Sequence, residues 1–271
     1  MKSLVTALAA ITSLLAGTAT AELGAVVSSF PGPAGGCPMA LARSREALYA
    51  FCKLEAGPAR AVIYRYNPKS GSVENAFALP PPPDSNYSGL AYTADGSLWI
   101  ANSTVDLLYR LDAETGSVKK SFGLYGEDIR GLAAKHNPAT GGPILGIWAR
   151  NSRPKAVTLY DHLTGEIKER WFWNPGGADI GWLYGKELIF AGLTQGSGYF
   201  VQVFKPPGEI VATFPAPAPC PVYGCAYYEG YLWLSTSRTE TTYQAYIWQV
   251  DVRELISVAP TSIGRVKALF R

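Results

Sequence analysis

The sequence is short of the residues on which many enzymes and metal sites depend. It contains two histidines, His136 and His162, and its four cysteines form no Cys-x-x-Cys pair. A structural zinc site needs a cluster of thiolate and imidazole ligands, and general-base catalysis most often uses histidine. We therefore expect neither a zinc centre nor a histidine-based active site.

Charge and long apolar runs are scarce as well. Charged residues make up 17% of the chain, and their formal sum is +3. The basic residues are scattered and form no run, so we expect no nucleic-acid partner. Beyond the N-terminus no apolar run approaches the roughly 20 residues that a membrane-spanning helix requires. We therefore expect no transmembrane segment.

The N-terminus has the pattern of a secretory signal. Lys2 precedes an uncharged apolar run over residues 4–17, and Ala19-Thr20-Ala21 follows as a small-residue cleavage motif. This combination is typical of a signal peptide. We predict that residues 1–21 are a signal peptide cleaved after Ala21, and that the mature protein is secreted, periplasmic or at the cell surface.

One pattern occurs five times: a glycine, then valine or isoleucine two residues later, then phenylalanine or tryptophan six residues after the glycine. The copies start at Gly24, Gly71, Gly116, Gly165 and Gly208. Successive copies are 43 to 49 residues apart, which is the length of one four-stranded blade of a β-propeller. We predict an all-β protein, a five-bladed β-propeller with four antiparallel strands per blade.

The order of the repeated segments predicts how the ring closes. After each copy comes a strand of small residues, such as residues 89–92, and then a bulkier strand, such as residues 98–101. The first copy precedes any such strand, and the last set of strands, ending at residue 251, has no copy after it. Residues 22–30 should therefore supply the outer strand of the last blade; a linear β-solenoid would not show this phase. The propeller spans residues 22–251, and residues 252–271 form a C-terminal extension.

Residues 89–116 contain GLAYTADGSLWIAN and then YRLDAETG. These repeats resemble a propeller superfamily that includes gluconolactonase-like, virginiamycin B lyase-like, quinoprotein-like and glutaminyl cyclase-like proteins. The resemblance covers nearly all of the mature chain and implies the fold. Five blades are most similar to the glutaminyl cyclase-like group. Of that group's glutamate-bearing inner-strand motifs only residues 126–129 look similar, with Glu127 one residue out of register with the other blades.

Ligands of propellers usually occupy the face at which the innermost strands begin. Polar residues there come from the starts of innermost strands and the ends of the strands that follow them. The candidate ligand-binding residues are Asn86, Tyr87, Asn102, Asp128, Arg130, Arg150, Asp179, Gln195, Tyr223 and Arg238.

Three of these candidates, Asp128, Arg130 and Asp179, fall at matched positions in neighbouring blades, so we expect them to converge. Two carboxylates and a guanidinium would bind a cation, a sugar or a peptide terminus, or perform acid–base chemistry; the preferred alternative is an ion-paired plug. No cofactor is expected. Calcium is the one metal considered, because Asp128 and Asp179, with Asn86 and Asn102, would offer the oxygen ligands that it takes.

Aromatic and cysteine residues suggest two further features. Most tyrosines and tryptophans fall at fixed strand positions and should pack in the core, whereas Tyr87, Trp182, Tyr223 and Tyr243 are candidates for exposure. In an exported chain an even number of cysteines indicates disulfides. We predict Cys37–Cys52 within the first blade and Cys220–Cys225; the alternative is Cys37–Cys220 with Cys52–Cys225.

The sequence thus predicts an exported propeller that binds a ligand or a protein at its channel mouth without catalysis. The partner would be a small molecule, a sugar, a peptide or a surface protein. The alternative is an enzyme acting at the same place, either glutaminyl cyclase-like or a metal-assisted lactonase. For residues 252–271 an outer strand or short helix is preferred over a sorting tag.

Overall fold

The structure is a computed structural model of the 271-residue chain. It describes residues 22–54, 61–80, 86–124, 127–135, 146–153, 155–173, 179–183, 188–195, 198–236 and 244–257. The predicted signal peptide, His136, Arg238 and Tyr243 lie outside these residues.

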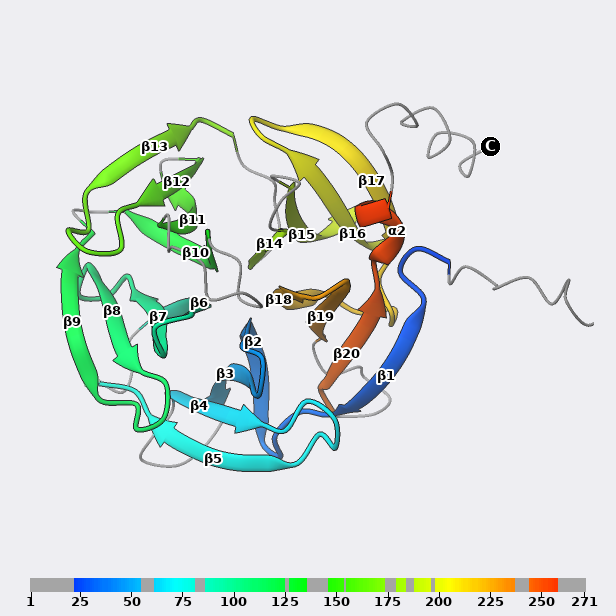
Figure 1. Ribbon diagram of the computed structural model, residues 1–271, viewed down its shortest axis with the longest axis horizontal. Coiled ribbons are helices and arrows are strands. Elements are labelled where there is room, and N and C mark those ends of the chain that lie inside the picture. The colour runs from blue at the N-terminus through cyan, green and yellow to red at the C-terminus, as the bar shows by residue number, and fades with distance from the viewer. Residues whose placement is uncertain are drawn as a thin grey trace, which may run out of the picture.

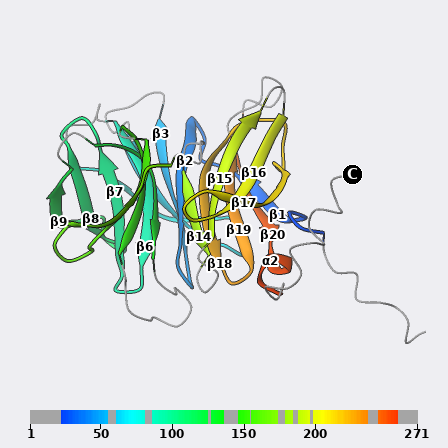
Figure 2. The same ribbon diagram turned by 90° about the horizontal axis from the view of Figure 1, so that it is seen from above.

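Five four-stranded antiparallel sheets stand around a central axis, so the chain is a five-bladed β-propeller, as predicted (Figure 1). Turned by 90°, the sheets stand side by side across the molecule (Figure 2). The strands nearest the axis are β2 (Gly36–Arg43), β6 (Tyr87–Thr93), β10 (Asp128–Ala134), β14 (Ile180–Leu183) and β18 (Val222–Tyr228). The second strands are β3 (Leu48–Leu54), β7 (Ser97–Asn102), β11 (Ile147–Arg153), β15 (Leu188–Gln195) and β19 (Tyr231–Thr236).

The third strands are β4 (Ala61–Tyr66), β8 (Leu107–Asp112), β12 (Ala156–Tyr160), β16 (Gly198–Lys205) and β20 (Tyr246–Asp251). The outer strands are β5 (Val73–Ala78), β9 (Val118–Gly123), β13 (Ile167–Trp171), β17 (Glu209–Pro215) and β1 (Val26–Pro31). We number the blades one to five, beginning with the sheet that contains β2. The axis lies at the innermost strands, and each blade runs outward from it.

The ring closes by pairing the two ends of the propeller. Strand β1 is the outer strand of blade five and pairs with β20, with Phe30 opposite Ile247. Just before the strand, the Gly24 N–H donates to the Asp251 carbonyl at 2.8 Å, and the Asp251 N–H donates to the Ala25 carbonyl at 2.9 Å. The predicted phase is therefore confirmed, and both ends of the propeller are held in the same sheet.

The repeated glycine and aromatic residue join neighbouring blades. Gly71, in blade one, has φ +70°, and a Cβ built there would lie 2.5 Å from Cγ of Phe30 in blade five. Only glycine combines this backbone conformation with such close contact to a ring. The same contact joins Gly24 to Phe214, Gly116 to Phe77 and Gly165 to Phe122. The pattern thus records the contacts between consecutive outer strands.

The copy at Gly208 departs from this rule. Its neighbour is Trp173, which lies two residues beyond Trp171, the aromatic residue of the repeat. Trp171 instead stacks on Trp148 of its own blade, with ring centroids 4.3 Å apart. The joint between blades three and four is therefore built from a different aromatic residue than the repeat predicts.

Each junction between blades has its own hydrophobic core. Five clusters of buried side chains each draw their residues from two neighbouring blades. Between blades three and four, for example, Trp148 and Trp182 have ring centroids 5.6 Å apart. Burying such large rings supplies much of the stability, so cohesion of the fold depends on the interfaces between sheets.

A short helix, α2 (Arg253–Ser257), follows β20. Leu255 packs against the core between blades four and five, so the extension begins with a short helix. Residues 258–271 lie outside the described chain. No helix among the described residues is long and apolar enough to cross a membrane.

Candidate functional site

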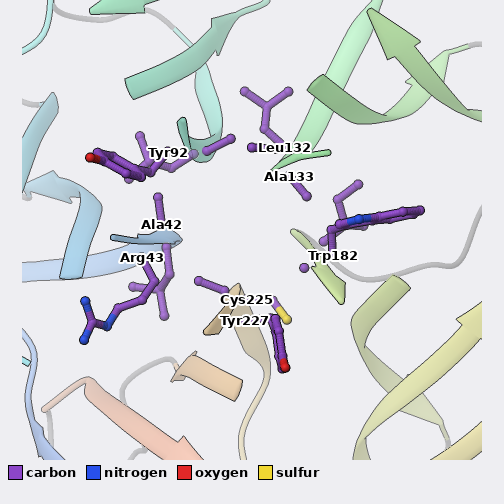
Figure 3. A pocket seen from close by; sticks show the side chains of 15 residues that line it. Ala42, Arg43, Tyr92, Leu132, Ala133, Trp182, Cys225 and Tyr227 are labelled. Carbon is purple, nitrogen blue, oxygen red and sulfur yellow. The ribbon is translucent and has the colours of Figure 1, made fainter. Parts of the chain in front are cut away.

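The innermost strands approach one another so closely that they leave little space on the axis. A Cβ built at Gly131 would lie 2.7 Å from Cα of Asp179, and one at Gly89 would lie 2.6 Å from the backbone nitrogen of Leu132. This contact explains why these strands are made of small residues. The space that they enclose has a volume of about 40 Å³, and the rings of Trp182 and Tyr227 point away from its centre (Figure 3).

One buried carboxylate connects four of the five blades across the axis. Asp179, which immediately precedes β14 of blade four, is 1% exposed. Its Oδ2 accepts the N–H groups of Leu41 in blade one and Cys225 in blade five, each at 3.2 Å. Its Oδ1 accepts the N–H of Leu132 in blade three at 3.1 Å. Asp179 is therefore a structural cross-link between blades. Its carboxylate is held by backbone N–H groups rather than by the ion pair that the sequence suggested.

The place of the innermost strands in their sheets makes these amides available. Strands β2, β10 and β18 are the inner edges of their sheets, so each pairs on one side only. An edge strand presents unpaired backbone N–H groups on its open side. The innermost strands can therefore donate toward the axis.

Two opposing effects act on Asp179. Burial raises the pKa of Asp179 well above its ordinary value, while the backbone N–H groups of Cys225 and Leu41, among others, lower it. The charge of Asp179 also acts on Arg150: burial lowers the pKa of Arg150 to about 10, and Asp179 opposes that shift. Arg150 and Asp179 are thus electrostatically coupled.

A larger cavity opens where the innermost strands begin. It has a volume of about 370 Å³, and we call it the polar cavity. Its lining residues are Met39, Lys53, Asn86, Tyr87, Ser88, Gly89, Arg130, Arg150, Ser152 and Tyr223. They come from blades one, two, three and five.

Asp179 lies at the boundary between the two spaces. In β10 the chain passes from Arg130, which lines the polar cavity, to Leu132, which bonds Asp179 and lines the small axial space. The same order, cavity residue then amide donor, holds in β2 and β18. Asp179 therefore forms the floor of the polar cavity.

Of the lining residues that the structure describes, three are cationic and none is acidic. Arg130 makes an ion pair with Asp128 at 2.8 Å, and the Ser152 hydroxyl donates to the same carboxylate at 2.5 Å. Burial lowers the pKa of Lys53, and the charge of Arg130 lowers it further. Arg130 acts on Arg150 in the same direction. The cavity thus holds like charges close enough to repel one another.

The structure brings five of the ten candidate residues together in the polar cavity: Asn86, Tyr87, Arg130, Arg150 and Tyr223. Asp128 is held beside it by Arg130, and Asp179 lies beneath it. Of the three side chains expected to converge, Asp128 and Arg130 meet in an ion pair, whereas the oxygens of Asp179 accept backbone amides from three other strands.

The remaining candidates lie outside the polar cavity or outside the described residues. Asn102 is fully buried, and its Oδ1 accepts the Thr104 N–H at 3.0 Å. Gln195 ends β15, whose last side chains are not described, and Arg238 lies outside the described residues. Tyr87 and Trp182, expected to be exposed, are 2% and 5% exposed. Both rings pack in the hydrophobic core, and Tyr87 also borders the polar cavity.

Sequence reasoning missed four lining side chains: Met39, Lys53, Ser88 and Ser152. All four obey the rule that identified the others, since Met39 and Ser88 lie near the start of an innermost strand and Lys53 and Ser152 near the end of a second strand. Lys53, whose Nζ donates to Asn86 Oδ1 at 3.4 Å, was therefore identifiable from its place in blade one.

Glu127 is engaged within blade three. Its carboxylate accepts hydrogen bonds from Asn151 Nδ2, the Tyr160 hydroxyl and Arg170, with which it also forms an ion pair. The glutamate that looked similar to the glutaminyl cyclase-like motif is thus 8% exposed and joins three strands of its own blade.

No disulfide joins the four cysteines, all of which lie among the described residues. Cys37 pairs in register with Lys53, and Cys52 pairs with Pro38. Because neighbouring residues of a strand point to opposite faces, this register directs Cys37 and Cys52 to different sides of the sheet rather than opposite each other as expected. Disulfide pairing therefore stays a prediction, without the geometry on which it was based.

Among the described residues, no group of three or more His, Cys, Asp or Glu side chains could hold a metal. Of the oxygens considered for calcium, those of Asp179 and Asn102 already accept backbone N–H groups. His162 lies in the turn between β12 and β13, away from the polar cavity lining, and burial lowers its pKa.

No family model matches this chain, and no curated protein matches it significantly. Solved structures do share its fold. The glutaminyl cyclase of Myxococcus xanthus is 12% identical, with 85% of this chain and 97% of that chain covered and a TM-score of 0.60. The WD40 repeats of RRP9 are 12% identical, with 79% and 78% covered and a TM-score of 0.51. At such low identity the likeness shows the fold alone, and that fold is a β-propeller.

Proposed function

We propose that the protein binds a small molecule in the polar cavity and acts as a binding module rather than an enzyme. The observation that carries this proposal is the cavity of about 370 Å³, with clustered cations and tyrosines above the floor made by Asp179. Concave sites with an apolar lining and a few placed polar groups are the usual small-molecule sites.

The chemistry of the lining favours binding over catalysis. Among the residues that the structure describes, the lining contains no histidine, cysteine or carboxylate that would serve as base or nucleophile. Burial raises the pKa of Tyr223, so its phenol stays protonated and donates a hydrogen bond. Asp128 is engaged by Arg130 and Ser152, and Asp179 by backbone amides. A general base needs a free acceptor within reach of the substrate. Asp128 Oδ1 accepts no hydrogen bond from the described residues, but it is buried away from solvent.

We also propose that the protein is exported, because residues 1–21 have the pattern of a cleaved signal peptide. N-terminal sequencing of the protein from the envelope or medium of its own cells tests this. A start at Glu22 supports export, and an intact Met1 in the cytoplasm contradicts it.

Thermal denaturation of residues 22–271 with a panel of small molecules tests the binding proposal. The panel contains calcium, simple sugars, small organic acids and peptides with N-terminal glutamine. We expect a compound that raises the melting temperature, with the shift lost in Tyr223→Ala and kept in Tyr64→Ala. Tyr64 is a suitable control because it is also half-buried but lies outside the cavity. No shift with any compound, or one that survives Tyr223→Ala, would contradict the proposal.

A second candidate function is a glutaminyl cyclase-like activity. It is favoured by the fold shared with the Myxococcus xanthus enzyme over 97% of that chain. Incubation with a peptide that begins with glutamine, followed by mass spectrometry, tests it. Formation of the cyclised product with release of ammonia would replace the non-catalytic proposal; unchanged peptide at stoichiometric protein would remove this candidate.

A further inference from the structure

We infer that the polar cavity binds an organic acid, whose anionic group lies on Lys53, Arg130 and Arg150 and whose apolar body lies against Met39, Tyr87 and Tyr223. This inference rests on the proposed function and specifies the ligand class of the same site.

The first support is the charge of the lining. Among the described lining residues three are cationic and none is anionic. The carboxylates that act on these cations are Asp128, which bonds Arg130 and Ser152 beside the cavity, and Asp179, which accepts three backbone amides beneath it. The described lining itself therefore carries only positive formal charge.

The second support is the position of Lys53. Its hydrogen-bond partner among the described residues is the neutral amide oxygen of Asn86, at the long distance of 3.4 Å. Partial burial lowers the pKa of Lys53, and the charge of Arg130 lowers it further. Lys53 is exposed to solvent, and an incoming anion would offset its repulsion by Arg130.

The third support is the geometry of the two arginines and the apolar residues. Arg130 and Arg150 extend from adjacent strands, β10 and β11, which are paired at Gly131 and Arg150. Planar guanidinium groups bind carboxylates with two parallel hydrogen bonds. Tyr87 and Tyr223 come from blades two and five, so apolar surface faces the cations from neighbouring blades. This arrangement suits a flat body that carries a carboxylate.

Isothermal titration calorimetry of residues 22–271 tests the inference with three probes: benzoate, its neutral analogue benzamide, and inorganic phosphate. We expect benzoate to bind roughly tenfold or more tightly than benzamide, since a hydrogen bond to a charged group is worth about 1.5–3 kcal/mol. Raising the salt concentration should narrow that difference. Benzamide that binds as tightly as benzoate, or phosphate that binds more tightly, would overturn the inference.

Two variants locate the effect. Lys53→Met should weaken benzoate about tenfold, and Lys69→Met should leave it unchanged. Lys69 lies in the same blade, in the exposed turn between β4 and β5, so it controls for the loss of one positive charge. Equal benzoate affinity in Lys53→Met and wild type would overturn the inference. If a neutral sugar stabilises the protein through Tyr223 while benzoate does not bind, the inference fails and the proposed function stands.

Discussion

Asp179 offers the most demanding test of how the ring is held at its centre. Replacing it with alanine leaves the N–H groups of Leu41, Leu132 and Cys225 without their acceptor. Each stranded buried donor costs about 1–3 kcal/mol. Part of this cost is offset, because the variant no longer buries a carboxylate away from water. We therefore expect Asp179→Ala to lower the free energy of unfolding by about 3 kcal/mol, the lower end of the summed cost.

Urea denaturation at neutral pH, followed by tryptophan fluorescence and circular dichroism, measures the change. Asp128→Ala is the matched control. It removes a carboxylate four residues before the Leu132 donor in β10, and Asp128 is half-buried and paired with Arg130. Exposed pairs contribute about 0–1 kcal/mol, so the control should stay within that range. If Asp179→Ala were no more destabilising than Asp128→Ala, the reasoning about an axial cross-link would be refuted.

Three other predictions test the joints of the ring and its cysteines. Gly71→Ala should lower the free energy of unfolding by about 2 kcal/mol or more, because it adds overpacking against Phe30 to the cost of a left-handed backbone. Gly96→Ala, at φ +74° with nothing within 4 Å of its Cβ, carries only the backbone cost. Equal losses of stability in thermal unfolding would contradict the contact between Gly71 and Phe30. Deleting residues 22–31 removes β1 and should abolish cooperative unfolding, and a truncated protein with wild-type stability would disprove the closure. Burial raises the pKa of Cys52 and Cys225 well above the ordinary value, so in the native reduced protein a thiol reagent should modify half-buried Cys37 before either of them; labelling of Cys52 or Cys225 ahead of Cys37 would contradict this.

Much of the fold was readable in the sequence because its joints repeat. The glycine and aromatic pattern recurs since each Gly must meet a ring of the preceding blade, as Gly71 meets Phe30. The phase of that pattern was enough to predict that β1 completes the sheet of β20. The copy at Gly208 shows the limit, because Trp173 rather than the repeat's Trp171 forms the contact.

The site was less predictable because its determining features are not periodic. Position within a blade placed Asn86, Arg130 and Tyr223 in one cavity. The role of Asp179 depends on amides from residues 46 to 138 positions away in the chain, and no local pattern signals that meeting. The bulge between Pro38 and Ala40 shifts the register that the Cys37–Cys52 prediction assumed. Irregularities of one residue thus decided which side chains meet.

The central claim is that the polar cavity above Asp179 is a site for an organic acid. A crystal structure of residues 22–271 with benzoate tests it most directly. We predict electron density for benzoate in the cavity, with the carboxylate within hydrogen-bond distance of Lys53 and of Arg130 or Arg150. The benzoate ring should lie against Tyr223, and Asp179 should still accept its three backbone amides. Benzoate bound elsewhere, or lying in the cavity with its carboxylate turned away from these cations, would contradict it.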